Sequence, residues 1–209
     1  MVKRALIVEA DQVEKAVAVL RRGGLVAYPT DTVYGLGADA FDEQAVLRVY
    51  RAKGRPPTEP LPLLVADLAQ MAQVTEDIPE VARLLARRFL PGGLTLVVPR
   101  SPALPSLISA GGANIGVRIP DHPVALALIR GLGRAIVGTS ANLSGQPSPV
   151  TAQEVYQQLG DRIDLIIDGG RCPGGRESTV VDCTAQPPRV LREGIIARAE
   201  VEKAIREGS

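Results

Sequence analysis

Short apolar segments alternate with segments of helical periodicity along most of this sequence, and this alternation limits the fold more than any other feature. Each apolar segment is three to six residues long, which suits a β-strand better than a helix. The 21 glycines and 17 prolines are spread along the chain and mark turns between many short elements. The expected strands cover residues 6–8, 25–28, 61–65, 94–98, 115–119, 135–138, 165–167, 178–183 and 189–192.

Polar residues that can cap a helix stand at the start of several helical segments. Asp11 with Glu14, and Thr151 with Glu154, have the spacing of a capping box. Asp42 precedes a helical segment that runs to about residue 52. These residues predict three helix starts.

The remaining helical segments complete the predicted fold. Helices are expected over residues 78–90, 122–132 and 199–206, and His122 is interpreted as helping to start the second of these. Strands and helices alternate early in the chain, whereas strands crowd together late. The pattern predicts an α/β fold with one domain over residues 1–209, in which helices flank a twisted mixed β-sheet.

Composition and charge exclude several classes of protein. The net charge is +1, from 24 basic and 23 acidic residues, without the basic excess typical of a non-specific nucleic-acid binder. No apolar run approaches the roughly 20 residues that a membrane span needs, so we expect no membrane association. The amino-terminal residues lack the pattern of a signal peptide, and Cys172 and Cys183 form no CxxC pair. Both features favour a cytoplasmic location with reduced cysteines.

Polar and basic residues collect where the expected strands end. Hydroxyl-rich segments follow two strands at residues 30–32 and 139–142, and Arg118 lies between apolar neighbours inside a strand. Each feature alone has an ordinary interpretation, as a turn, a helix cap or a solvated arginine. Together they favour an anionic ligand beyond the strand ends, where α/β sheets usually bind ligands.

Several well-known motifs are missing from the sequence. There is no GxxxxGK[ST] loop and no GxGxxG at a strand-to-helix turn. The single histidine, His122, cannot supply a Ser-His-Asp set or a metal site by itself. From its residues alone, the chain is expected to be a one-domain α/β protein that binds a phosphorylated small molecule.

Seven segments give the sequence a more specific resemblance. Over about residues 10–195 the chain resembles the YrdC-like family, and in particular the short threonylcarbamoyl-AMP synthases that lack the extra carboxy-terminal domain of longer relatives. The chain ends soon after the matching segments, so we expect no second domain. The segments are GGLVAYPTDTVYGLGADA, KGRPPTEPLPLLV, PGGLTLVV, IGVRIPDHP, GTSANLSG, ESTVVDCT and RVLREG.

The resemblance implies a sheet folded around a deep positive cavity and an enzyme of the nucleotidyltransferase class. It implies the synthesis of L-threonylcarbamoyladenylate and pyrophosphate from L-threonine, bicarbonate and ATP, with Mg²⁺ bound through the ATP phosphates. The product would serve the threonylcarbamoyladenosine modification of tRNA at adenosine 37. The implied partners are downstream tRNA threonylcarbamoyl-transferase proteins, and weak RNA binding is possible.

The resemblance also implies roles for particular residues. Two departures from the family bear on them: Glu59 stands where some relatives carry Asn, and Leu64 where some carry His. Catalytic roles fall on Lys53 and Arg55; threonine contacts fall on Thr32, Arg118, Gly138 and Ser178; ATP contacts fall on Arg55, Glu59, Asn114, Ser140, Asn142, Ser148 and Arg192.

Three other interpretations stay open at this point. The same arginines could clamp an RNA backbone without catalysis, although only six aromatic residues are available for base stacking. A second is a module that handles carbamoyl-adenylate, as in hydrogenase-maturation proteins, whose zinc-binding cysteines this chain lacks. The third is a binding module that has lost its activity.

Overall fold

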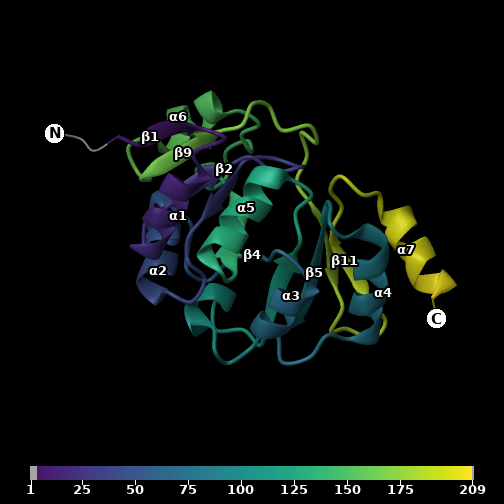
Figure 1. The fold of residues 1–209 in the computed structure, drawn as a ribbon. Helices are drawn as coiled ribbons and strands as arrows, with labels where there is room; N and C mark the ends of the chain where they lie inside the picture. The colour runs from purple at the N-terminus through teal and green to yellow at the C-terminus, as the bar shows by residue number, and fades with distance from the viewer. Residues whose placement is uncertain (1–3, 209) are drawn as a thin grey trace.

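The computed structural model describes residues 4–208, so residues 1–3 and 209 of the predicted domain lie outside the described residues. Strands and helices mix along the chain as predicted, and helices surround the strands (Figure 1). The strands are β1 Leu6–Glu9, β2 Val26–Tyr28, β3 Gly35–Gly37, β4 Leu63–Leu64, β5 Leu94–Pro99, β6 Asn114–Arg118, β7 Ile136–Val137, β8 Thr139–Ser140, β9 Leu165–Asp168, β10 Thr179–Asp182 and β11 Arg189–Arg192. The helices are α1 Val13–Arg21, α2 Glu43–Lys53, α3 Leu68–Val74, α4 Glu80–Phe89, α5 Pro123–Leu132, α6 Ala152–Leu159 and α7 Arg198–Glu207, with a short 3₁₀ turn at Ser106–Ser109.

The predicted mixed sheet is divided into two hydrogen-bonded sheets. One has the order β1-β9-β2-β3-β8 and the other β11-β10-β5-β6-β4-β7, and both contain parallel and antiparallel neighbours. The two sheets meet where the chain leaves β7 in one sheet and enters β8 in the other, with Gly138 between them. A Cβ atom at Gly138 would lie 2.4 Å from Leu64 Cγ, so glycine permits this close approach.

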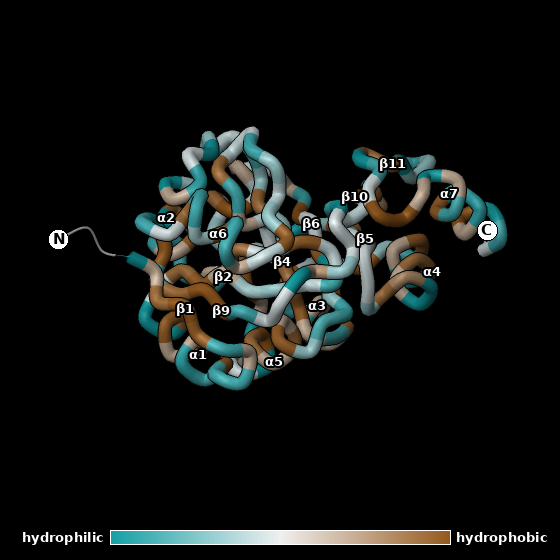
Figure 2. The backbone as a smooth tube through the Cα atoms, turned by 90° about the horizontal axis from the view of Figure 1, so that it is seen from above, coloured by the Kyte–Doolittle hydropathy of each residue, from teal (hydrophilic) through white to brown (hydrophobic). Residues whose placement is uncertain are grey.

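The central strands of the first sheet are covered on both faces. In β2, Val26 and Tyr28 point into one apolar cluster with α1 and α5, whereas Ala27 points into the larger cluster on the other face. Alternation along a strand produces this division, because successive side chains point to opposite faces. Figure 2 shows hydrophilic segments along much of the periphery, whereas the chain around β4, near the centre, is hydrophobic.

Three helices or strands were absent from the sequence prediction, namely β3, β8 and α3. β3 begins and ends with glycine, and the Tyr28 ring occupies the space beside both glycines. A Cβ at Gly35 or Gly37 would lie 2.8 Å from that ring. Among residues 4–208, no helix is long and apolar enough to cross a membrane.

The predicted helix caps have different outcomes. The Asp42 side chain accepts hydrogen bonds from the backbone amides of Gln44 and Ala45, as predicted. Thr151 caps α6 by accepting from the Glu154 amide. The cap predicted at Asp11 is wrong, because Gln12 occupies the N-cap position and makes no side-chain cap bond. His122 stands at the N-cap position of α5, also without a side-chain cap bond.

The difference between these caps predicts a difference in stability. Asp42→Ala should lower the free energy of unfolding by about 1 kcal/mol, because two amides of α2 lose their acceptor. Asp11→Ala is the matched control and should change it by less than about 0.5 kcal/mol. Urea denaturation of both variants measures the two values, and equal losses would contradict the assignment.

Candidate active site

A cavity of about 720 Å³ lies where the two sheets meet. This volume is in the range of small-molecule sites. The cavity brings together segments that are far apart in the sequence, including the loops after β2 and β8 and the amino-terminal end of β10. Eleven of the twelve predicted site residues line it: Thr32, Lys53, Arg55, Glu59, Arg118, Gly138, Ser140, Asn142, Ser148, Ser178 and Arg192.

Asn114 is the one predicted site residue that does not line this cavity. It is exposed at the start of β6, where its Nδ2 donates a hydrogen bond to Thr184 Oγ1 at 3.1 Å. The residue of β6 that reaches the cavity beside Arg118 is Gly116. The nucleotide contact proposed for Asn114 stays a prediction.

Arg118 is buried at one end of the cavity and joins the two sheets. Its Nη1 donates to Thr32 Oγ1 at 2.9 Å, its Nη2 to Asp31 at 2.5 Å, and its Nε to the Gly92 carbonyl at 2.8 Å. Burial lowers the pKa of Arg118, and the neighbouring Asp31 partly offsets that effect. The buried charge is therefore paired and hydrogen-bonded, as a buried guanidinium needs to be.

Lys53 fixes the loop that follows β8. Its ammonium is buried and donates to the carbonyls of Ser140 (2.5 Å) and Asn142 (2.8 Å) and to the Asn142 side chain (3.3 Å). Burial and the charge of Arg55 lower the pKa of Lys53 to about 8, against the opposite effect of Glu177. The side chains of Ser140 and Asn142 thus belong to a loop held by a buried cation.

Arg55 lies just beyond α2 and pairs with the residue that departs from the family pattern. Its Nη2 is 3.3 Å from Glu59 Oε2 and 3.0 Å from the Pro60 carbonyl. The carboxylate at position 59 therefore offsets part of the charge of Arg55. The second departure, Leu64, is buried against Gly138 at the cavity wall.

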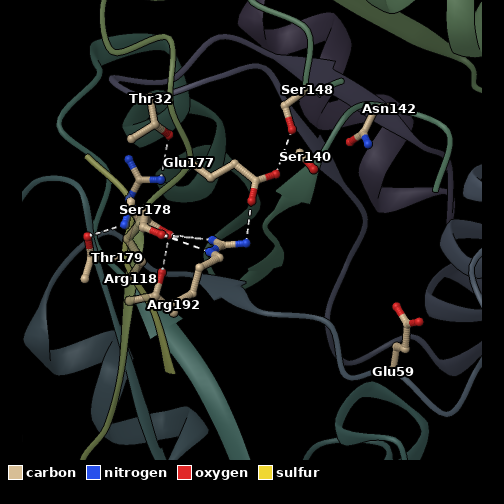
Figure 3. Close-up of polar contacts among 12 residues, drawn as sticks. Thr32, Glu59, Arg118, Ser140, Asn142, Ser148, Glu177, Ser178, Thr179 and Arg192 are labelled. Carbon is tan, nitrogen blue, oxygen red and sulfur yellow. Dashed lines mark hydrogen bonds and ion pairs between the residues drawn. The ribbon is translucent and has the colours of Figure 1, made fainter. Parts of the chain in front are cut away.

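A second polar cluster occupies the wall formed by β5, β10 and β11. The hydroxyls of Thr95 and Ser178 are 2.8 Å apart, and Arg192 donates to the Ser178 carbonyl from Nε at 3.2 Å and from Nη2 at 2.9 Å. Figure 3 shows the Glu177 carboxylate between Ser148 and Arg192, with hydrogen bonds to both, whereas Glu59 lies apart.

Sequence reasoning missed two of these residues, Thr95 and Glu177. Both lie inside segments that carry the family resemblance, PGGLTLVV and ESTVVDCT, and this was the available signal. Only the fold shows that they face the same cavity as Ser178 and Arg192.

The arrangement suits an anionic ligand that also carries polar groups. Four cationic residues line the cavity against two carboxylates, Glu59 and Glu177. Three of the four cations are paired with carboxylates, namely Asp31, Glu59 and Glu177, so the positive charge of the cavity stays a prediction. His122 is absent from the described lining, so no Ser-His-Asp set forms there.

Nothing in residues 4–208 forms a group of three or more His, Cys, Asp or Glu side chains that could hold a metal ion. Both carboxylates of the cavity are already paired with arginines. The donor set therefore fits a cation that arrives on phosphate oxygens better than one held by the protein alone.

Comparisons with known proteins agree with the resemblance. A family model for Sua5, YciO and YrdC proteins, described as telomere recombination, matches residues 18–194. The chain is 46% identical over 200 residues to a Pyrococcus abyssi threonylcarbamoyl-AMP synthase, covering 96% of this chain and 59% of that protein. It is 47% identical over 195 residues to a Bacillus subtilis protein of the same name, covering 93% and 56%.

A solved structure gives the same result. The crystal structure of Pyrococcus abyssi Sua5 complexed with L-threonine has a TM-score of 0.91 and 44% sequence identity, and the match covers 98% of this chain and 61% of that one. This chain spans less than two thirds of the length of these three proteins. The matched family model covers most of the chain, and the chain therefore belongs to the Sua5/YciO/YrdC family.

Proposed function

We propose that this protein is an L-threonylcarbamoyladenylate synthase, which forms threonylcarbamoyl-AMP and pyrophosphate from L-threonine, bicarbonate and ATP. The observation that carries the proposal is the convergence of eleven predicted substrate contacts on one cavity of about 720 Å³. The names of the relatives, and the threonine complex of one of them, support it.

The end of the cavity around Arg118 is the proposed threonine site. Arg118 offers a buried positive charge for a carboxylate, and Thr32 and Ser178 offer hydroxyls beside it. Gly138 leaves room at the wall between them. A site that hydrogen-bonds the substrate hydroxyl rejects an analogue that lacks it. Such a site favours threonine over valine.

The other groups of the cavity are the proposed ATP site. Arg55 and Arg192 carry charge for phosphate oxygens, and Ser140, Asn142 and Ser148 add polar contacts. Lys53 acts on this side through the loop that it holds. Glu59 contributes through its pairing with Arg55.

The proposed reaction needs no covalent intermediate with the enzyme. The threonine amine adds to the carbon of bicarbonate-derived CO₂ and loses a proton, which gives a carbamate. A carbamate oxygen then attacks the α-phosphorus of ATP, and the bond to the bridging oxygen breaks as pyrophosphate leaves. Magnesium bound to the ATP phosphates would supply charge neutralisation.

Positioning should supply much of the rate enhancement. A bound carbamate held against the α-phosphate gains on the order of 7–11 kcal/mol over the same reaction between free molecules. Arg55 and Arg192 would add a few kcal/mol by stabilising the charge on the phosphates. The rigid Arg118 and Lys53 contacts suit this role, because they fix both walls before the substrates bind.

The biological setting follows from the proposed product. Threonylcarbamoyl-AMP would be consumed by transferase proteins that modify adenosine 37 of tRNA. The proposed reaction does not require this chain to bind RNA itself. A cytoplasmic location fits this role, and cell fractionation tests it.

The direct test of the proposed function is the release of pyrophosphate from ATP. We expect release only when threonine and bicarbonate are both present. Threonine supplies the nitrogen of the attacking carbamate, and bicarbonate supplies its carbon and oxygens. Release without threonine would favour the carbamoyl-adenylate module, and no release under any condition would contradict catalysis.

Arg55→Ala should slow pyrophosphate release at least about a hundredfold, because the transition-state charge loses a preorganised cation. The fold should be unaffected, since the Arg55 side chain is partly exposed and its hydrogen bonds and ion pair are with Glu59 and Pro60. Arg51→Ala, at an exposed position in the last turn of α2, is the matched control and should retain activity. Near-normal rates in Arg55→Ala would remove its assigned role.

ATP affinity should weaken as the pH rises through about 8. Lys53 is charged below its pKa of about 8 and neutral above it, and only the charged form is favoured by nearby phosphates. Titration calorimetry should show at most about a tenfold loss per pH unit above this value. Lys53→Met should bind weakly and without this pH dependence, whereas Lys15→Met, at an exposed lysine, should keep it. An unchanged pH profile in Lys53→Met would contradict the assignment.

A further inference from the structure

The cavity contains a carboxylate that its proposed ligand should repel. Glu177 lines the cavity two residues before β10, among the groups assigned to ATP phosphates. Its Oε1 accepts a hydrogen bond from Ser148 Oγ at 2.6 Å, and its Oε2 forms an ion pair with Nη1 of Arg192 (Figure 3). Two proposed nucleotide donors are therefore already bound to an anion that belongs to the protein.

The orientation of Arg192 does not depend on Glu177. The Nε and Nη2 side of the guanidinium is held by the Ser178 carbonyl at 3.2 and 2.9 Å. Nη1 is the part that remains for a ligand, and Glu177 occupies it. Removing the carboxylate should thus expose Nη1 without releasing the arginine.

Glu177 carries a negative charge at neutral pH. Burial alone would raise the pKa of its carboxyl group, but the Ser148 hydroxyl and Arg192 lower it, as do Ser140 and Lys53. The pKa therefore lies below the usual value for glutamate. The carboxylate competes with other anions throughout the physiological range.

We propose that Glu177 is a specificity-determining residue, an internal anion that occupies Arg192 Nη1 and Ser148 Oγ until a polyphosphate displaces it. The proposal rests on the ATP site proposed above and adds what controls its selectivity. A single phosphate gains little by displacing Glu177, because it exchanges one anion for another. A nucleotide triphosphate can do so, since it also meets Arg55, Ser140 and Asn142.

Binding of inorganic phosphate and pyrophosphate tests this proposal without requiring turnover. Titration calorimetry would compare the wild type with Glu177→Gln, which keeps the shape and removes the charge, and with Glu177→Asp, which keeps the charge. We expect Glu177→Gln to bind phosphate at least about tenfold more tightly, equivalent to about 1.4 kcal/mol, and pyrophosphate more tightly by a smaller factor, so that the preference for pyrophosphate falls. Glu177→Asp should stay within about threefold of the wild type.

The control is Glu80→Gln, which removes the same charge from an exposed ion pair with Arg87. It should leave anion affinity unchanged. A thermal melt of each variant confirms folding, and Glu177→Ala provides a second neutral variant with the same expected gain. The gain is expected in folded protein because the Arg192 side chain is 48% exposed and water can solvate it.

Two results would overturn the proposal. Weaker binding by both neutral variants would mean that Glu177 helps to hold the ligand, for example through a ribose hydroxyl or magnesium. Unchanged binding would mean that it does not compete for Arg192. In either case the proposed function stands if the wild type still releases pyrophosphate with threonine. If neither the wild type nor the variants bind pyrophosphate, the ATP site itself is absent and both proposals fail.

Discussion

The buried guanidinium of Arg118 is the contact on which the geometry of the cavity depends. It extends from β6 of one sheet to Thr32 and Asp31, which follow β2 of the other, and it also binds the Gly92 carbonyl. Burying a charge is costly, and removing one partner of such a pair typically destabilises a protein by about 3–5 kcal/mol. The contact therefore holds the two sheets together at one end of the cavity.

The sequence predicted the elements whose signal is local. The strand at 189–192 and the helix capped by Asp42 are present with nearly the expected bounds. The prediction failed where tertiary contacts decide. β3 needs its glycines because the Tyr28 ring occupies the adjacent space, and this becomes visible only once β2 and β3 pair. Asp11 has the spacing of a cap, but α1 begins beyond Gln12, so its side chain caps nothing.

The site shows the same division between local and tertiary information. The resemblance identified residues by position, and the fold brings all of them except Asn114 to one cavity. The resemblance could not show which contacts these side chains make within the protein. Lys53 was assigned a catalytic role, and the fold adds that its ammonium donates to the loop at residues 140–142. Glu177 was missed because a glutamate before a strand usually faces water, and only the fold places Ser148 and Arg192 beside it.

A crystal structure with L-threonine and a non-hydrolysable ATP analogue tests the central claim most directly, namely that one cavity between two sheets holds both substrates. The account predicts the threonine carboxylate beside Arg118 and Thr32. It predicts the phosphates near Arg55 and Arg192, with the α-phosphorus closest to the amino group. Electron density for either molecule outside the cavity, or with these ends exchanged, would contradict it.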